Sequence, residues 1–570
     1  MQMQWKILQP DPERVLDIQH ALQCHPITAT ILANRCIGTI GQVTQFMQPS
    51  LDNLPAPTLL KGAQRAAERI AAALNKKEKI MIFGDYDADG ITATAVLFNF
   101  LKAAGGDLFY HLPHRLEEGY GLQPMHIMQL AVPQRVNLIV TVDCGSSSFE
   151  AVAAARRFGI DVIVTDHHNI DGHLPDAHTI VNPKMADQPA ELADLAGVGV
   201  AFYLAIALRT VLRAQGWWQN RPEPNLKGYC DLVAIGTVAD MVSLQGVNRV
   251  LTRVGLECIN KGPRPGIQAL LNAAGIRHTP ITAEDISFRI GPRINAAGRV
   301  AHAKIAFDLL NAPSLASAQP LAEDLNALNI RRQATENEIY KHIIKNIENR
   351  PASLTCKSLL LAGSEWHEGV LGIVAAKLVA RYHRPVVVVS ARDGMAKGSA
   401  RSIPQLDLHS ALTRCEHLLE RFGGHRMAAG LTVRTENIGK LQTALEAAVT
   451  DMLQDQPSGP QIDIDSEIAL GQISAQLIDE LELLSPFGTD NPAPLFMARE
   501  VKVTTAAIVG RTHRRMVLCQ PDSCTPPVAA IHFNIEPDCP RLDAFARLAF
   551  RVQWNRYKGN KEIQLVVEAF

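Results

Sequence analysis

Short apolar runs alternate with helix-like segments from about residue 78 onwards. Residues 79–83 form an apolar run that ends at a glycine, and residues 91–103 repeat apolar side chains at helical spacing. Continuous apolar strands that alternate with helices are typical of a parallel sheet covered on both faces. The pattern therefore predicts an α/β domain with a doubly wound parallel sheet. Its further strands are expected at residues 107–112, 137–142 and 160–165, with a helix at 147–158.

Residues 313–350 have the pattern of one long helix. Leu321, Leu325 and Leu328 share one face, and isoleucines continue it at spacings of four, while the other side is rich in Glu, Asn, Lys and Arg. A connector between two domains and an ordinary core helix explain this pattern equally well.

The chain beyond this helix divides into two regions. Strand-like runs at 358–362 and 385–390, with helical patterns at 369–381 and 437–453, predict a smaller α/β domain. Several short strand-like runs after residue 456 indicate a small β-barrel or sandwich. The predicted division of the chain is 1–312, 313–350, 351–455 and 456–570.

Composition and charge exclude some classes of protein. Apolar residues make up 47% of the 570 residues and charged residues 20%, an ordinary globular balance. The 56 Lys and Arg against 57 Asp and Glu give a net charge of −1, which excludes a uniformly basic binder such as a histone-like protein. Local basic regions are still present. Residues 501–570 hold ten basic side chains against six acidic ones and residues 381–430 hold eight against four, whereas residues 451–500 hold one against ten.

Export and membrane signals are missing from the sequence pattern. No run of about 18 uninterrupted apolar residues is present, so no membrane-spanning segment is predicted. The first residues have no apolar core behind a basic start, which predicts no secretory signal. The ten cysteines are scattered without a C-x-x-C pair, so we expect reduced thiols in a cytoplasmic protein, with no disulfides and no zinc site.

Acidic residues and histidines gather where the predicted strands end. They follow residues 83, 142 and 165, and a further acid follows an apolar helix-like run at 232–239. In one doubly wound sheet, these ends converge on a single rim. The candidate catalytic residues are Asp85, Asp87, Asp89, Asp143, Asp166, His167, His168 and Asp240.

Carboxylates that converge in this way repel one another and raise each other's pKa unless a cation neutralises them. A mixed set of Asp and His ligands suits Mn²⁺ or Mg²⁺ better than a soft metal, since Cys144 is the one thiol near the rim. Two such ions hold the attacking and leaving oxygens of a phosphoryl transfer and lower the pKa of a shared water. The cluster therefore predicts hydrolysis of a phosphodiester.

Each motif taken alone has another explanation. The D-x-D-x-D-G spacing at residues 85–90 copies the first half of an EF-hand calcium loop, but that loop needs Glu at its twelfth position, where Val96 stands. Asp143 alone would serve as a helix N-cap, and the adjacent histidines alone would serve as a structural pair. Their combination in one sheet favours the metal site.

An ordered set of motifs runs from about residue 50 to the C-terminus. It comprises GDYDADG (84–90), PHRLEEGYG (113–121), VDCG (142–145), DHH (166–168), AD (239–240), GPRINAAGR (291–299), GSARS (398–402) and GGHRMAAG (423–430). With these motifs the chain resembles the DHH phosphoesterase superfamily and, within it, the RecJ family of bacterial 5′→3′ exonucleases that act on single-stranded DNA. The tripeptide DHH alone is a weak signal, but the ordered set is highly specific.

The resemblance implies that five rim residues bind two metal ions, Mn²⁺ or Mg²⁺, with Asp143 bridging them. Asp85 and Asp166 would orient the ligands, and His168 would stand at the border between metal and substrate. Other members of the superfamily have a His two residues before Asp85, where this chain has Phe83. Either one ion is then held more weakly, or Asp85 takes that place. The implied metal ligands are Asp87, Asp89, Asp143, His167 and Asp240.

Gly-rich and Arg-rich motifs supply candidate phosphate contacts. Residues 423–425 are predicted to lie ahead of a helix, where they offer bare backbone N–H groups and the imidazole of His425 to a phosphate; a tight turn onto a helix of small residues is the alternative. The hydroxyl and guanidinium groups of residues 398–402 suit a terminal phosphate. The resemblance implies that the 5′ end of the strand is captured by Arg115, Arg293, Ser399 and Arg401, and His425 is a further candidate substrate contact.

The resemblance also assigns the regions as a DHH domain, a connecting helix, a DHHA1 domain and an OB fold over residues 456–570. OB folds bind single strands with a basic groove and stacking aromatic side chains. A solvated charged face is the alternative for these side chains. The candidates are Arg511, Arg514, Arg515, Arg551, Trp554, Arg556, Tyr557 and Lys558.

Taken together, the sequence predicts a metal-dependent exonuclease that shortens single-stranded DNA from its 5′ end and releases mononucleotides. A cleft between the domains that is too narrow for a duplex would select single strands. One alternative is a DHH phosphodiesterase that acts on short oligonucleotides or other small phosphate substrates, and another is a non-catalytic DNA-binding replication factor. The resemblance implies single-strand-binding protein and recombination or mismatch-repair factors as partners of a monomeric enzyme.

Overall fold

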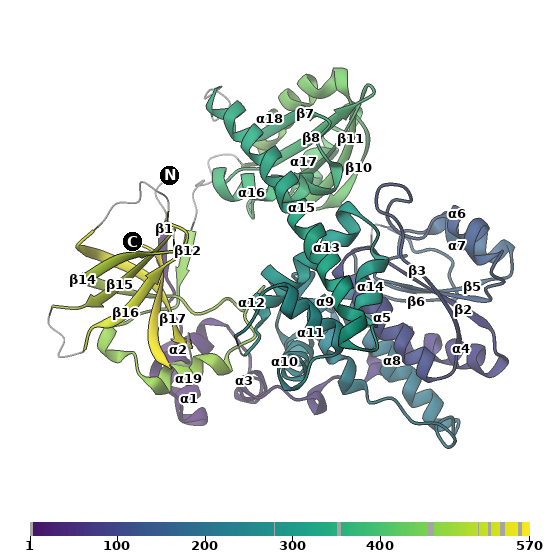
Figure 1. The fold of residues 1–570 in the computed structure, drawn as a ribbon, viewed down its shortest axis with the longest axis horizontal. Coiled ribbons are helices and arrows are strands. Elements are labelled where there is room, and N and C mark those ends of the chain that lie inside the picture. Colours follow the sequence, from purple (N-terminus) through teal and green to yellow (C-terminus); the bar gives the residue numbers. More distant parts are fainter. Residues whose placement is uncertain are drawn as a thin grey trace.

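The structure, a computed structural model, has three lobes (Figure 1). A parallel sheet with its helices forms one lobe, a smaller mixed sheet forms the second at the top of the view, and a barrel on the left contains both marked chain ends. The predicted strand contacts Arg511, Tyr557 and Lys558 lie outside the described residues. The structure describes the whole chain except residues 1–3, 171, 279, 350–354, 454–460, 511, 522–525, 536–541 and 557–560.

The first lobe is built on a parallel sheet, which confirms the predicted fold class. Its strands run in the order β3-β2-β4-β5-β6, and every neighbouring pair is parallel. The strand order reverses between β2 and β4, and ligand sites of doubly wound sheets lie at such a reversal. The strands are β2 (Lys79–Gly84), β3 (Asp107–His111), β4 (Leu138–Val142), β5 (Asp161–Thr165) and β6 (Thr179–Val181).

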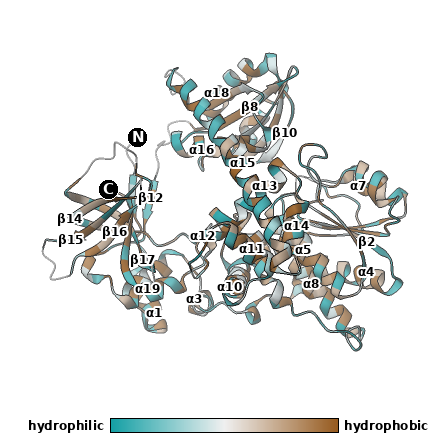
Figure 2. Ribbon diagram, viewed as in Figure 1, coloured by the Kyte–Doolittle hydropathy of each residue, from teal (hydrophilic) through white to brown (hydrophobic). Residues whose placement is uncertain are grey.

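Helices cover both faces of this sheet. The large core on one face contains α4 (Ala63–Lys76), α5 (Ala88–Ala103), α8 (Gly197–Ala214) and α9 (Cys230–Ala239), while α7 (Phe149–Arg157) covers the other face. Helix α8 is long and apolar enough to cross a membrane, but 67% of it is buried in this core, as in the core helix of a globular domain. The outer helices show both apolar and polar colours in Figure 2, as helices that face a core on one side do.

A single helix, α15 (Leu315–Glu348), joins the first lobe to the second. Its first half packs in the core of the parallel-sheet lobe and its second half packs in the core of the mixed-sheet lobe. The helix is therefore a connector, and the alternative of a core helix within one domain is wrong. The packing residues are Ala318, Ala322 and Leu325 in the first half and Ile339, Ile343 and Ile347 in the second.

The second lobe has a mixed sheet in the order β10-β11-β9-β8-β7, with α16 (Glu368–Tyr382) and α18 (Ile438–Leu453) packed in its cores. Only β7 and β8 are parallel; the other neighbouring strands are antiparallel. The strands are β7 (Leu359–Ser364), β8 (Val386–Arg392), β9 (Met395–Arg401), β10 (Leu419–His425) and β11 (Ala428–Arg434).

The predicted helix after Gly423 and Gly424 is wrong. These residues end β10, and Gly423 pairs with Gly430 while His425 pairs with Ala428 across an antiparallel hairpin. The small residues of this motif suit a helix and a closely packed hairpin equally, and pairing of β11 with β9 selects the hairpin. The backbone N–H groups of this segment are therefore part of a ladder and do not form a helix N-terminus.

The third lobe is a closed barrel, as the predicted OB fold requires. Strand β14 (Phe496–Val509) pairs with both β15 (His513–Cys519) and β17 (Ala544–Asn555). Strands β16 (Val528–His532) and β18 (Glu562–Ala569) close the ring between them. Helix α19 (Ala475–Leu483) packs on this barrel and contributes to its core.

Of the five described side chains that were predicted to hold a DNA strand, three are bound within the barrel lobe itself. The Trp554 indole donates to Asp479 at 2.7 Å, and Arg556 pairs with Glu482 at 2.7 Å. These contacts favour the alternative of a solvated charged face, in which the side chains pair with acids of the same lobe. Arg515 is exposed and forms no ion pair within the described residues. Of the others, Arg514 is buried and Arg551 pairs with Glu568 at 3.2 Å.

The N-terminal segment lies against the barrel lobe, although the predicted division groups it with the DHH domain. Strand β1 (Gln4–Ile7) pairs in parallel with β12 (Gln461–Ile464). Helices α1 (Pro12–Leu22), α2 (Pro26–Asn34) and α3 (Ile40–Met47) share one apolar core with α19 and the barrel strands. Residues 4–47 therefore belong in space with the C-terminal lobe.

Replacing Leu32 with Ala is expected to loosen the barrel. The Leu32 side chain on α2 is fully buried in the core shared with the barrel, and such a truncation costs about 3 kcal/mol of folding free energy. Hydrogen exchange should become faster in β14 and β17 and stay unchanged in β2 and β4. Asp17→Ala, at an exposed position on α1, is the control. Equal exchange in Leu32→Ala and the parent protein would contradict the shared core.

Candidate metal centre and strand-end cleft

The predicted acids and histidines meet at one rim of the parallel sheet. Asp85 and Asp87 follow β2, Asp143 follows β4, and Asp166 to His168 follow β5. Asp240 joins them from a different element, the end of α9, where it is the C-cap residue. All eight candidate catalytic residues thus lie together, because parallel strands end on the same edge and α9 points at it.

His167 stands at the centre of this cluster. Its Nε2 atom lies 3.1 Å from Asp143 Oδ1, 3.5 Å from Asp240 Oδ2 and 3.8 Å from Asp89 Oδ2. A neighbouring group of carboxylate oxygens, from Asp85, Asp87 and Asp143, lies within 4.8 Å. Asp143 belongs to both groups, which is the arrangement that a ligand bridging two ions requires.

The backbone of two helices fixes the first acidic motif. Asp87 caps α5, and its Oδ1 accepts the N–H groups of Asp89 and Gly90 at 3.0 and 3.1 Å. The Asp89 carboxylate accepts the N–H groups of Gly197 and Val198 at the start of α8, at 2.6 and 2.9 Å. A Cβ atom on Gly197 would lie 2.5 Å from Asp143 Oδ1, so only glycine lets α8 approach the rim this closely.

Burial and mutual repulsion disfavour the charged form of the rim carboxyl groups. Burial, together with the charge of Asp87, raises the pKa of Asp89 to about 7. Burial and then neighbouring carboxylates raise the pKa values of Asp85, Asp143 and Asp240 well above the ordinary value. Positive charge at the rim would stabilise all of these carboxylates.

Asp166 and His168 form a separate ion pair at the edge of the cluster. Burial alone raises the pKa of Asp166 and lowers that of His168, but the 2.7 Å hydrogen bond between them reverses both shifts. The pKa of Asp166 falls below its usual range, and that of His168 rises to about 9. His168 therefore carries a positive charge at neutral pH, and the Tyr120 hydroxyl lies 3.2 Å from its Nδ1 atom.

The donor atoms of the rim fit a divalent cation. Asp85 Oδ1, Asp143 Oδ1 and His167 Nε2 are buried and have no hydrogen-bond partner among the described residues. Leaving a buried polar atom unpaired costs about 1–3 kcal/mol. Burial, followed by the charge of His168, lowers the pKa of His167 to about 3, so its imidazole is neutral and has a lone pair available. Carboxylates with a neutral imidazole are ligands that Mn²⁺ and Mg²⁺ accept.

Cys144 is not part of this donor set. Its side chain is fully buried, and its Sγ atom lies 3.9 Å from the carbonyl oxygen of Phe83. Burial and then the charge of Asp85 raise the pKa of the thiol well above its ordinary value. Cys144 therefore stays protonated and supplies no thiolate.

The GPRINAAGR motif supports the first acidic loop. It forms α13 (Gly291–Val300), and Asn295 Oδ1 accepts the N–H of Ala88 at 2.8 Å. A Cβ atom on Gly298 would lie 2.2 Å from the carbonyl oxygen of Tyr86, so the helix packs directly on the loop backbone. The motif thus holds residues 86–88 in place beneath the rim.

A cleft of about 400 Å³ between the first and second lobes adjoins the rim. Tyr86, which lies between two rim acids, lines it together with Arg115, whose guanidinium lies 4.9 Å from the Tyr86 ring centre. Ser399 and Lys397 line it from the second lobe. The structure therefore brings the predicted contacts Arg115 and Ser399 to one cleft, although they are far apart in the chain.

Arg401 and Arg299 add positive charge next to this cleft. Burial and then the charge of Arg115 lower the pKa of Arg401, and the same two causes lower the pKa of Arg299 to about 10. Neither forms an ion pair with a carboxylate among the described residues. Arginines gathered in this way point to an anionic ligand.

Two other predicted substrate contacts lie elsewhere. Arg293 donates to Asn326 at 3.0 Å and to the carbonyl of Arg289 at 2.7 Å, and it does not line the cleft. His425 is exposed at the end of β10, where its Nδ1 lies 3.5 Å from the amide nitrogen of Asn169. His425 therefore lies next to Asn169, the residue that follows His167 and His168 in the chain.

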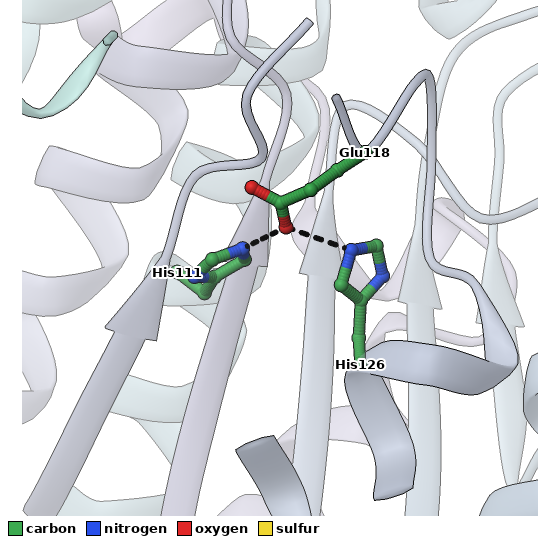
Figure 3. Close-up of side chains that lie close together, drawn as sticks. All are labelled: His111, Glu118 and His126. Carbon is green, nitrogen blue, oxygen red and sulfur yellow. Dashed lines mark hydrogen bonds and ion pairs between the residues drawn. The ribbon is translucent and has the colours of Figure 1, made fainter. Parts of the chain in front are cut away.

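A second group of possible metal ligands, His111, Glu118 and His126, lies beside β2 (Figure 3). It is better explained as a hydrogen-bonded structural group, in which one carboxylate links two histidines. Glu118 Oε2 lies 2.7 Å from His111 Nε2 and 3.0 Å from His126 Nε2. His126 Nδ1 accepts the N–H of Gln123, so in the neutral ring Nε2 carries the proton and donates it to Glu118. A metal would need the lone pair of that nitrogen. The fully buried Phe83 packs on His126, with 4.8 Å between ring centres.

Three contributors to the site were not predicted from the sequence. They are Tyr120, Asn295 and Gly197, which support other side chains or the backbone of the site. The chemical type of such a residue does not reveal this role in the sequence. Tyr120 and Asn295 do stand inside the ordered set of motifs, so motif membership was the available signal. Gly197 stands in none of them.

Comparisons with known proteins agree with this arrangement. Three family models match the chain: the DHH family N-terminal domain over residues 79–237, the DHHA1 domain over 352–451 and the RecJ OB domain over 464–569. The single-stranded-DNA-specific exonuclease RecJ of Salmonella typhimurium is 38% identical over 522 residues, which cover 89% of this chain and 90% of that protein.

Solved structures show the same likeness. The structure of RecJ from Thermus thermophilus in complex with Mn²⁺ is 29% identical, with a TM-score of 0.84, and the match covers 100% of this chain and 79% of that one. The Mg²⁺ complex of the same protein matches with a TM-score of 0.78 at 29% identity, covering 100% of this chain and 78% of that one.

Proposed function

The chain belongs to the RecJ family, and from this premise we propose that it is a single-stranded-DNA-specific exonuclease that uses two Mn²⁺ or Mg²⁺ ions. It removes mononucleotides from the 5′ end of the strand. The observation that carries the proposal is the buried rim itself, where acids and a neutral histidine converge next to a cleft lined with arginines.

The rim residues divide into ligands and supporting groups. Five residues would hold the two ions, and Asp143 would be the ligand that both share; the five are Asp87, Asp89, Asp143, His167 and Asp240. When bound, such ions lower the pKa of a water molecule and neutralise charge on the scissile phosphate. The 2.7 Å hydrogen bond between Asp166 and His168 holds the imidazole at the edge of the rim, where it would meet the phosphate. Asp85 takes a supporting place next to Asp87 and Asp143.

The cleft binds the end of the strand. Arg115, Ser399 and Arg401 supply guanidinium and hydroxyl donors for a terminal 5′ phosphate, and burial strengthens such charge-assisted hydrogen bonds. Arg293 and His425 remain candidate contacts for nucleotides beyond the terminal one. Since the cleft lies between two lobes joined by α15, its width sets the preference for a single strand.

The family places the enzyme in DNA recombination and repair. Its proposed partners are single-strand-binding protein and recombination or mismatch-repair factors, and its proposed location is the cytoplasm. We propose that it acts as a monomer, because one chain supplies the complete rim and the cleft.

Labelled DNA tests the proposed function. With Mn²⁺ or Mg²⁺ present, a 5′-labelled single strand should release its label as mononucleotide from the start of the reaction, whereas a 3′-labelled strand should shorten progressively. A chelator should abolish both reactions, because no ion is then left to lower the pKa of the attacking water or to neutralise charge on the scissile phosphate. A blunt duplex is the control substrate. Release of the 3′ label first, or cleavage that survives chelation, would contradict the proposal.

A further inference from the structure

We propose that residues 484–491, here called the docking segment, position the metal ligand Asp240, so that the C-terminal lobe acts on metal binding as well as on the strand. This inference rests on the proposed function, because it takes Asp240 as a ligand. The docking segment follows α19 of the barrel lobe, whereas Asp240 ends α9 of the parallel-sheet lobe.

Asp240 needs external support more than the other ligands do. The other ligands directly follow strands of the sheet or begin α5, so ladder hydrogen bonds hold the backbone just before Asp143 and His167, and the N–H groups of α5 and α8 bind Asp87 and Asp89. Asp240 is the C-cap residue that follows α9, and Met241 after it turns away with a φ of 61°, in the left-handed region. The direction of the Asp240 side chain therefore depends on what holds the turn from Met241 to Leu244.

Thr489 of the docking segment holds both ends of this turn. Its hydroxyl donates to the carbonyl oxygen of Met241 at 2.7 Å, and its own carbonyl accepts the N–H of Leu244 at 2.9 Å. The side-chain amide of Gln245 also donates to the carbonyl of Asp490 at 2.6 Å. These bonds join the two lobes one residue away from the proposed metal ligand.

Arg249 anchors the docking segment to the same lobe. It is buried on α10 (Gly246–Lys261), and its guanidinium donates to the carbonyls of Leu484 at 2.8 Å, Leu483 at 3.1 Å and Phe46 at 2.9 Å. One side chain thus ties the end of α19 and the end of α3 to α10, the helix that follows the Asp240 turn.

The internal structure of the docking segment suits it to this task. The buried Asn491 amide donates to the carbonyls of Leu484 at 3.0 Å and Pro486 at 2.8 Å. Gly488 and Asn491 exchange backbone hydrogen bonds across a tight turn that presents Thr489. These internal hydrogen bonds make the docking segment rigid, so the position of the barrel lobe determines the position of the Asp240 turn.

Thr489→Val tests the inference. Valine keeps the shape of the side chain and removes the hydroxyl that donates to Met241, so the turn after Asp240 loses one of the hydrogen bonds that hold it. Losing a group that orients a metal ligand costs about 10-fold in metal affinity. We therefore expect Mn²⁺ binding, measured by electron paramagnetic resonance without DNA, to weaken about 10-fold. Thr489→Ser keeps the hydroxyl and should restore parental affinity.

Two further measurements separate positioning from general damage. Thr504→Val removes a similar exposed hydroxyl, which donates to the Val517 carbonyl at 3.0 Å within the barrel, and should bind Mn²⁺ as the parent does. The KM of Thr489→Val for single-stranded DNA at saturating Mn²⁺ should be unchanged. Parental Mn²⁺ affinity in Thr489→Val, or equal loss in Thr504→Val, would overturn the inference. If the parent protein failed to cleave DNA, the proposed function would fall instead, and the Mn²⁺ titration would still be readable.

Discussion

Replacing Asp143 with Ala is expected to abolish strand hydrolysis. Asp143 Oδ1 lies 3.1 Å from His167 Nε2 and also belongs to the group formed with Asp85 and Asp87, so its loss disrupts both halves of the rim. The rate should fall on the order of 1,000-fold, the upper end of what losing one electrostatic contact to a transition state costs. Single-turnover digestion of a 5′-labelled strand at saturating Mn²⁺ measures this.

The same variant should remain folded. The buried Asp143 carboxyl is repelled by neighbouring acids in the metal-free protein, so its removal relieves an unfavourable interaction while it deletes few atoms. The melting temperature of the metal-free variant should equal or exceed that of the parent. Asp176→Ala, which removes an exposed acid that pairs with Arg156 in the same lobe, is the control and should cleave normally. Metal-dependent cleavage by Asp143→Ala at the parental rate would contradict the proposed role of the rim.

Replacing Arg115 with Ala is expected to impair recognition of the 5′ phosphate. Arg115 lines the cleft together with Tyr86 and Ser399, and its charge lowers the pKa of the half-buried Arg401, after the larger effect of burial. A hydrogen bond to a charged group contributes up to about 3 kcal/mol, which corresponds to about 100-fold in kcat/KM. The loss should appear with a 5′-phosphorylated strand and be small with a 5′-hydroxyl strand.

Comparison of the two strands separates this role from a structural one. If Arg115 only stabilised the loop that carries it, both substrates would lose activity equally. Arg157→Ala, at an exposed position on α7, removes a charge from the same lobe and should leave both rates unchanged. Arg115→Lys keeps the charge but loses the planar fork, so an intermediate rate is expected.

The metal rim was predictable from the sequence because its parts are local. Apolar runs predict the strands β2, β4 and β5, and the acids and histidines stand directly after them. Strands of a parallel sheet end on the same edge, so placing the residues in strands also places them together. The cleft is different. Arg115 and Ser399 come from two lobes, and only the resemblance to a family linked them before the structure showed them lining one cleft.

The sequence pattern failed where distant pairing decided the local structure. The motif at residues 423–430 consists mostly of small residues that suit a helix or a hairpin, and its pairing with β9 selects the hairpin. The basic and aromatic side chains of the barrel suggested a strand-binding face, but Trp554 and Arg556 are bound by acids of α19. In both cases the partner lies elsewhere in the chain and leaves no trace in local periodicity.

By itself, the sequence determined the fold class, the order of the regions and the chemistry of the rim, since these follow from short-range patterns of apolar, acidic and histidine residues. Only the tertiary structure decided which distant segments touch. It packs residues 4–47 on the C-terminal barrel and sets Thr489 against the turn after Asp240. Such contacts depend on the shape and hydrogen-bonding groups of surfaces that form only after folding, and therefore no local pattern encodes them.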